Sequence, residues 1–376
     1  MPKVQRSDKQ TDERMIRQSN IELLRIIAII IIIAHHFAVH SGFDFSADTV
    51  SLNRLWIRFI RIGGKIGVNI FVLISGYFLV SAQSIKTSKI LKLWGQVFFY
   101  SIVIFLVFSV SGLQPFSQQE LIEHIAPVTY SRWWFASTYF VLYMLSPYIN
   151  RLLRTFDRKQ YISFLLLLMV LWSVIPTITG SLLQSDPLFW FVFLYSLAGY
   201  IKLFGIKTDL SGKKLLLISF GCTVLTFITA VILDTAGNKS DYSASLAAFI
   251  YDMQSLPVLI ISLLMFMGFL KLDIGYNRII NTVSSAAFGV YLLHDDKYIR
   301  SFVWKRVLSN ADFSESFLLI PFSVLVIASV YICFTLIELI RIRFIESKYL
   351  LISDKAAAFI DKKKDAFISR LSDRLK

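Results

Sequence analysis

An arginine and a histidine lie eleven positions apart inside the first apolar segment of the chain. Arg25 and His36 belong to residues 20–37, a run rich in isoleucine. An ionisable side chain in a lipid bilayer is costly and marks a functional site by default. At about 100° per residue the two side chains return to one stripe of a helix, roughly 16 Å apart along its axis. The spacing predicts that an anion-binding cation and an imidazole base face a single cavity.

A second group of titratable side chains closes a later apolar segment, residues 288–300. There Tyr291 and His294 lie on adjacent turns of one helical face, and Asp295 and Asp296 follow the histidine directly. Counting depth along each segment, we expect His294 and His36 to lie toward the same side of a membrane. A packing histidine with one hydrogen bond would explain His294 nearly as well.

The other histidines give weaker signals. His35 points about 100° away from His36, which favours packing or hydrogen bonding over chemistry. His40 and His124 are expected at an interface or in a loop. The imidazoles and nearby carboxylates show no metal-ligand spacing, so we predict no metal centre.

The elements that carry these residues are predicted to be membrane-spanning helices. Of 376 residues, 56% are hydrophobic, and the mean hydropathy is +0.63, too apolar for one soluble core. The two cysteines lie within apolar segments, and no disulfide framework is expected. The predicted fold class is therefore an all-α polytopic membrane protein with about ten transmembrane helices. The predicted spans are residues 21–40, 63–82, 90–112, 133–150, 161–180, 187–204, 214–234, 249–271, 279–297 and 315–340.

The basic residues predict how the chain is oriented. Most of the 39 lysines and arginines fall in segments that share one side of the membrane if the N-terminus is cytoplasmic. The positive-inside rule then places both termini in the cytoplasm of a multi-pass protein of the plasma membrane. The same bias accounts for the net charge of +14, so nucleic-acid binding is not expected.

The chain divides into three predicted parts. Residues 1–18 form a cytoplasmic N-terminal segment that is retained, since no small-residue cleavage pattern follows it. Residues 19–343 form the ten-helix membrane domain. Residues 344–376 form a basic, amphipathic cytoplasmic tail, which we expect to lie as a helix at the membrane surface.

Several motifs along residues 19–343 resemble the integral-membrane acyltransferases of family three. They are Arg25 with His36 after ten intervening residues, GVNIF at 67–71 with SGY at 75–77, the segment 134–147, and FGVYLLH at 288–294. Two positions depart from the pattern of many members. Asn69 stands in place of an aspartate, and KILK at 89–92 replaces a paired-arginine motif.

The resemblance implies a membrane O-acyltransferase, with acetyl the expected group, that uses cytosolic acyl-coenzyme A and acylates a hydroxyl of a surface or lipid-linked glycan of the cell envelope. Acetyl-coenzyme A is then a donor substrate, and no tightly bound cofactor is expected. Further partners would be membrane lipids and glycan-synthesis proteins. The residues assigned are His36, Arg25 and His294 as catalytic, Arg25, Lys89 and Lys92 for the donor, and Trp134, Tyr291 and Asp295 for the acceptor.

Alternatives remain open on the sequence. His36 could act as a base toward the acceptor hydroxyl or carry the acyl group transiently. A transporter or flippase of a glycan or lipid precursor would also place charges and glycine-rich segments within a membrane. A purely structural partner in a glycan-synthesis complex would explain neither Arg25 nor His36.

Overall fold

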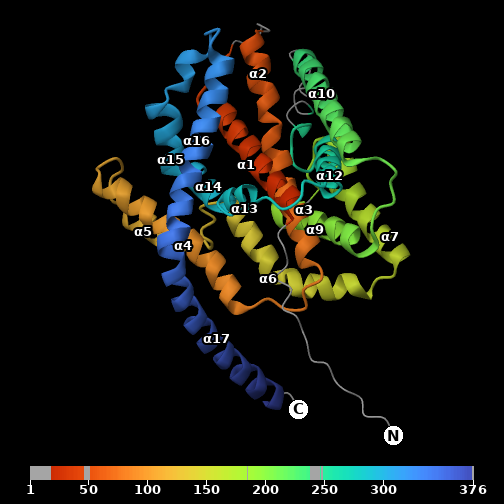
Figure 1. Cartoon of the computed structure of the whole chain (residues 1–376), viewed down its shortest axis with the longest axis vertical. Helices are drawn as coiled ribbons and strands as arrows, with labels where there is room; N and C mark the ends of the chain where they lie inside the picture. Colours follow the sequence, from red (N-terminus) through yellow and green to blue (C-terminus); the bar gives the residue numbers. More distant parts are fainter. Residues whose placement is uncertain (1–17, 46–50, 184, 238–245, 247–248, 375–376) are drawn as a thin grey trace.

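The computed structural model describes residues 18–45, 51–183, 185–237, 246 and 249–374. These residues form a bundle of helices, and no strand occurs among them (Figure 1). The helices are α1 (Ser19–His40), α2 (Leu52–Arg61), α3 (Gly63–Leu79), α4 (Thr87–Val110), α5 (Gln118–Ile125), α6 (Trp134–Thr155), α7 (Arg158–Met169), α8 (Ile175–Thr179), α9 (Pro187–Phe204), α10 (Gly212–Gly237), α12 (Leu256–Leu270), α13 (Arg278–Ser284), α14 (Ala287–His294), α15 (Lys297–Ser301), α16 (Leu319–Arg341) and α17 (Ser347–Arg374).

Short polar side chains begin several of these helices. Asp157 accepts hydrogen bonds from the first turn of α7, and the Gln160 side chain accepts one from the Asp157 backbone, which completes a capping box. Asp186 caps α9 directly before Pro187. Because caps satisfy backbone donors that have no partner within the helix, they define where each apolar segment starts.

Helix α1 occupies the middle of the bundle. It packs against α3 most extensively and also against α2, α12, α13, α14 and α16. Leu24, Ala28, Ile33 and Phe37 on α1 are almost fully buried. Figure 1 shows α1 between α16 and α14 on one side and α3 and α12 on the other. The helix that carries Arg25 and His36 is therefore held on most sides by other helices.

Glycines in α3 allow α1 to approach closely. A Cβ atom added at Gly67 would lie 2.7 Å from the Ala28 carbonyl oxygen and 2.7 Å from Ile32, and one added at Gly64 would overlap the His35 ring. Small residues at helix interfaces in membranes permit this kind of backbone contact. Gly64 and Gly67 therefore serve helix packing, and this packing fixes the position of the histidines on α1.

We expect Gly67→Ala to destabilise the protein by about 1–3 kcal/mol, because the new methyl group meets backbone that cannot move independently. Gly221→Ala is the matched control, since a Cβ there finds no atom within 4 Å and the residue is also helical. The control should leave stability unchanged or raise it by up to about 1 kcal/mol. Thermal unfolding of both variants in detergent checks this, and equal melting temperatures would contradict it.

Seven helices in the described residues are long and apolar enough to cross a membrane. They are Ser19–His40, Leu52–Leu79, Thr87–Val110, Arg158–Thr179, Pro187–Phe204, Gly212–Asp234 and Leu319–Asp373. The all-α membrane fold is thus confirmed, whereas the count of ten spans is not. Of the remaining predicted segments, 133–150 belongs to α6, whose tyrosines, Asn150 and arginines lower its hydropathy, and 249–271 contains only the 15-residue α12.

The predicted span 279–297 is not one helix. Helix α13 ends at Ser284, helix α14 begins at Ala287, and a turn separates them. In this turn the Ser285 hydroxyl donates to the Thr282 carbonyl at 2.6 Å, a local bond that competes with helix continuation. Broken helices at membrane depth are tolerated where they line a cavity. Both halves do line cavities, as described below.

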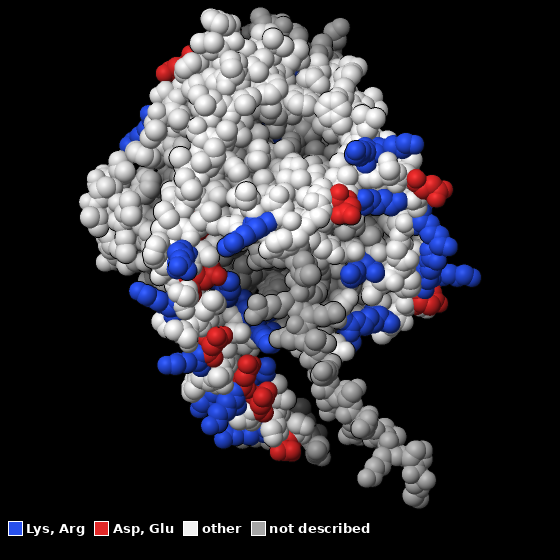
Figure 2. Space-filling view, in the orientation of Figure 1, with Lys and Arg blue, Asp and Glu red and all other residues white. Residues whose placement is uncertain are grey.

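The tail is helical and continues from the last span. Helix α16 passes through a π-helical segment, Ile342–Glu346, into α17. The start of α17 packs on α4, where the Tyr349 hydroxyl donates to the Leu91 carbonyl and Thr87 donates to Asp361 at 2.6 Å. On the face in Figure 2, charged side chains gather on the lower half, where α17 ends. That this end is cytoplasmic, and that the tail lies on the membrane surface, stay predictions.

Candidate active site

Helix α1 contributes to two cavities, one near each end. The first, which we call the His36 cavity, has a volume of about 240 Å³ and is lined by His36, Lys65, Trp134, Tyr291, Asp295, Arg300 and neighbouring side chains. The second, the Arg25 cavity, has a volume of about 1060 Å³ and is lined by Arg25, Lys89, Lys92, Arg278, Arg341 and others. The sequence placed Arg25 and His36 in a single cavity, and this differs from the structure.

The two cavities adjoin each other. Phe71, Phe135, Ala287 and Phe288 line both of them. The ring of Phe135 contacts Phe71 at 6.2 Å between centroids and Tyr291 at 5.4 Å, so the shared wall is largely aromatic. A wall of side chains without backbone hydrogen bonds across it can open by rotamer changes.

His36 and His294 form an imidazole pair. His36 Nδ1 lies 2.9 Å from His294 Nε2, and His294 Nδ1 lies 2.7 Å from the Val290 carbonyl oxygen. A carbonyl can only accept, so the proton of a neutral His294 is on Nδ1 and its Nε2 accepts. His36 must then donate from Nδ1. The pair therefore leaves the lone pair of His36 Nε2 free for chemistry.

Asp295 stands next to that free nitrogen. Its Oδ1 atom is 3.6 Å from His36 Nε2, and its side chain is 6% exposed. A carboxylate at this distance stabilises the imidazolium that forms when Nε2 takes a proton. The Val290 carbonyl, and not Asp295, orients His294. Asp295 lies beside His36 instead.

We expect His294→Ala to lower the turnover number by about 10- to 100-fold, as for partners that orient a reacting group. The reason is that His36 loses the acceptor that fixes its tautomer. His294→Gln should recover part of the loss, because a side-chain carbonyl can accept the same hydrogen bond. Steady-state kinetics of both variants check this. A loss that glutamine does not reduce, or one confined to donor affinity, would contradict the positioning role.

The predicted donor residues all line the Arg25 cavity. Arg25 Nε lies 3.8 Å from Glu22 Oε2, and this buried nitrogen has no hydrogen-bond partner among the described residues. Lys89 and Lys92 come from the start of α4. A large cavity with several cations suits a ligand with several anionic groups.

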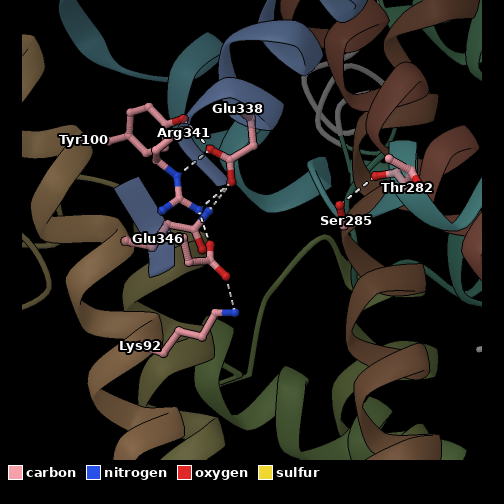
Figure 3. A network of polar contacts seen from close by, with 8 residues as sticks. Lys92, Tyr100, Thr282, Ser285, Glu338, Arg341 and Glu346 are labelled. Carbon is pink, nitrogen blue, oxygen red and sulfur yellow. Dashed lines mark hydrogen bonds and ion pairs between the residues drawn. The ribbon is translucent and has the colours of Figure 1, made fainter. Parts of the chain in front are cut away.

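A buried ionic network forms one wall of this cavity (Figure 3). Glu338, fully buried, accepts from Arg341 at 2.7 and 2.8 Å, from Gln96 at 2.8 Å and from the Tyr100 hydroxyl. Glu346 bridges Arg341, at 2.7 Å, and Lys92. Glu338 and Arg341 lie three positions apart, a spacing that by itself allows a local ion pair on one helix. The structure makes it the centre of a network that holds Lys92 and Arg341 beside the cavity.

Trp134, Tyr291 and Asp295, the predicted acceptor residues, all line the His36 cavity. Trp133 does not, since it is 1% exposed and its Nε1 donates to the Leu292 carbonyl at 3.0 Å. Trp133 therefore packs inside the helix bundle and not at a lipid-facing surface. Its hydrogen bond ties the start of α6 to α14.

Sequence reasoning did not assign two cations, Arg300 and Lys65, to the His36 cavity. Arg300 donates to Asp295 at 3.2 Å and to His40 at 3.4 Å, and Lys65 lies over Trp134. On the sequence, Arg300 counts only toward membrane orientation. Lys65 belongs to a basic helical face with Arg54, Arg58 and Arg61 that predicts either a lipid-headgroup anchor or a surface for an anionic acceptor. Arg300 follows Asp295 by five residues, so the sequence could have suggested an ion pair between them. Only the turn after α14 brings the two side chains together.

Among the described residues, one group has a geometry that could hold a metal ion. One ligand atom each from His36, His40 and Asp295 lies within 4.8 Å of the others. Arg300 already donates to two of these three side chains, so a guanidinium supplies positive charge at this point. The absence of a metal centre stays a prediction.

The fold and the cavities define a helical membrane protein whose helix α1 contributes His36 to one cavity and Arg25 to an adjoining one. The model of a protein family described as an acyltransferase domain, that of acyltransferase family three, matches residues 18–338. The chain belongs to this family, as its motifs indicated, and is a membrane acyltransferase. Comparisons with curated proteins and with solved structures found no significant match.

Proposed function

We propose that the protein transfers an acetyl group from cytosolic acetyl-coenzyme A to a hydroxyl of a surface or lipid-linked glycan. In this proposal the Arg25 cavity opens to the cytoplasm and binds the donor. The His36 cavity opens to the outer side and admits the acceptor hydroxyl. The protein is then a plasma-membrane O-acetyltransferase with both termini in the cytoplasm.

The observation that carries the proposal is the pair of adjoining cavities on one helix. Coenzyme A is a polyanion, and the Arg25 cavity offers Arg25, Lys89, Lys92, Arg278 and Arg341 against three glutamates. The smaller cavity offers a free imidazole nitrogen and aromatic walls. A donor arm that passes the shared aromatic wall would bring a thioester to His36 without moving coenzyme A itself across the membrane.

The proposed reaction uses His36 as a general base. His36 Nε2 takes the proton of the acceptor hydroxyl, and the hydroxyl oxygen attacks the thioester carbonyl carbon. The carbon–sulfur bond then breaks, and the coenzyme A thiolate leaves and takes the proton back from the imidazolium. Asp295 stabilises the imidazolium in between. A transient acyl-imidazole would use the same Nε2 lone pair, and rapid quenching without acceptor separates the two routes.

The test uses purified protein in proteoliposomes with acetyl-labelled acetyl-coenzyme A outside or inside and extracted envelope glycan as acceptor. We expect alkali-labile label in the glycan, which is typical of an ester. Movement of glycan across the bilayer without any transfer of label would instead support a transporter. In cells, the acetyl content of the surface glycan is compared between strains with and without the gene. We expect it to fall when the gene is removed.

A further inference from the structure

The charges in the His36 cavity do not balance. Its lining contains Lys65, Arg300 and Asp295 as charged side chains. Arg300 and Asp295 pair with each other at 3.2 Å. Among the residues that the structure describes, Lys65 makes no ion pair or hydrogen bond. Its Nζ atom lies over the Trp134 ring, 5.5 Å from the ring centre.

A lone ammonium group in such a cavity is expensive. Charged groups at membrane depth are normally paired or face a ligand pathway. A cation–π contact offsets only part of the desolvation cost. Trp134 therefore holds Lys65 within the cavity but does not neutralise it. An anionic group that enters the cavity would complete the pair.

Lys65 and the base share this small cavity. Lys65 follows Gly64, whose close contact with the His35 ring locks this turn of α3 against the end of α1 that carries His36. A ligand that places a hydroxyl at His36 Nε2 within about 240 Å³ thus brings its neighbouring substituents near Lys65. The selectivity of the site would follow from the charge of those substituents.

We propose that the acceptor is an acidic glycan, a sugar whose carboxylate or phosphate pairs with Lys65 while a nearby hydroxyl reaches His36. The inference rests on the proposed function and adds the chemical class of the acceptor. A charge-assisted contact in a partly dry cavity is stronger than a neutral hydrogen bond. Acidic sugars should therefore bind better than neutral sugars of the same shape.

The experiment compares two ligands that differ at one carbon, methyl β-glucoside and methyl β-glucuronide. Methyl β-glucoside 6-phosphate is a third arm that separates phosphate from carboxylate. Binding is measured by calorimetry on the full-length protein in phosphatidylcholine nanodiscs, where no anionic headgroup competes. Transfer from labelled acetyl-coenzyme A is measured separately. We expect the wild type to bind one acidic ligand about tenfold or more tightly than the glucoside, with the preference weakening at high salt.

Lys65→Gln should remove the preference, and Lys65→Arg should keep most of it. Lys297→Gln is the matched control, because Lys297 is 70% exposed, pairs with Glu120 and is not a lining residue of either cavity. This variant should keep the wild-type ratio of affinities for acidic and neutral ligands.

Two results would overturn the inference. One is equal or undetectable binding of all three sugars by the wild type. The other is a Lys65→Gln variant that weakens the binding of acidic and neutral ligands by the same factor. Absence of acetyl transfer together with a clear acidic preference would instead overturn the proposed reaction.

Discussion

His36→Ala should abolish acyl transfer while the protein still inserts and binds acyl-coenzyme A. Position 36 offers an unprotonated nitrogen beside a buried carboxylate, with its other nitrogen engaged by His294. A positioned base typically contributes about 100- to 10,000-fold to a rate. We expect a loss of that order in purified protein, measured as label transferred from acetyl-coenzyme A to glycan, with donor affinity unchanged.

His124→Gln is the control for this result. His124 is fully buried, contacts Ser101 and belongs to neither set of lining residues. Its substitution should lower thermal stability more than turnover. Near-normal turnover of the purified His36→Ala variant would contradict the assignment of His36 as the general base. Loss of acetyl-coenzyme A binding in that variant would place His36 in the donor site instead.

Arg25→Ala should weaken donor binding by about 10- to 100-fold, the equivalent of one lost charge-assisted hydrogen bond of about 1.5–3 kcal/mol. The guanidinium carries a buried Nε without a hydrogen-bond partner in a cavity where other cations gather. Arg25→Lys should recover only part of the affinity, because an ammonium cannot make a bidentate contact with phosphate. Titration with acetyl-coenzyme A at low and high salt measures both.

Arg343→Ala is the control for Arg25. Arg343 is exposed and lies beyond the ionic network of Arg341, and it is absent from the lining of the Arg25 cavity. Donor affinity should be unchanged in this variant. Equal affinity in the wild type, Arg25→Ala and Arg25→Lys would remove Arg25 from the donor site and leave it with Glu22 in a structural role.

Local pattern explains why much of the fold could be predicted. The long apolar runs that form α1, α4, α9 and α16 are read directly from composition, since a spanning helix satisfies its own backbone hydrogen bonds. The prediction of one continuous helix over 279–297 was wrong, because the mean hydropathy of this segment is the same whether or not the helix is continuous. The break at Ser285 depends on a side-chain bond and on packing against α1, and neither of these alters a hydropathy average.

The site residues also fall into those that local sequence pattern predicts and those that only the packing of helices reveals. Arg25 and His36 could be recognised from type and spacing, because a period of 3.6 residues acts within one helix. The donor and acceptor groups were also named from motifs, and each lines the cavity in which its role would be performed. Arg300 escaped notice because a basic residue near a predicted membrane boundary already has an explanation. The basic face that contains Lys65 was read first as a lipid-headgroup anchor, with an anionic acceptor as the alternative.

By itself the sequence determined that this chain is a helical membrane protein with a cation and an imidazole on one stripe of its first helix, and its motifs indicated the family. Only the tertiary structure decided that His36 is paired with His294, 258 positions away, and that Arg25 and His36 line two adjoining cavities. The physical reason is that periodicity and hydropathy act over one helix, whereas the partner of a side chain is chosen when helices pack. Glycines in α3 and the broken α13–α14 segment control that packing here.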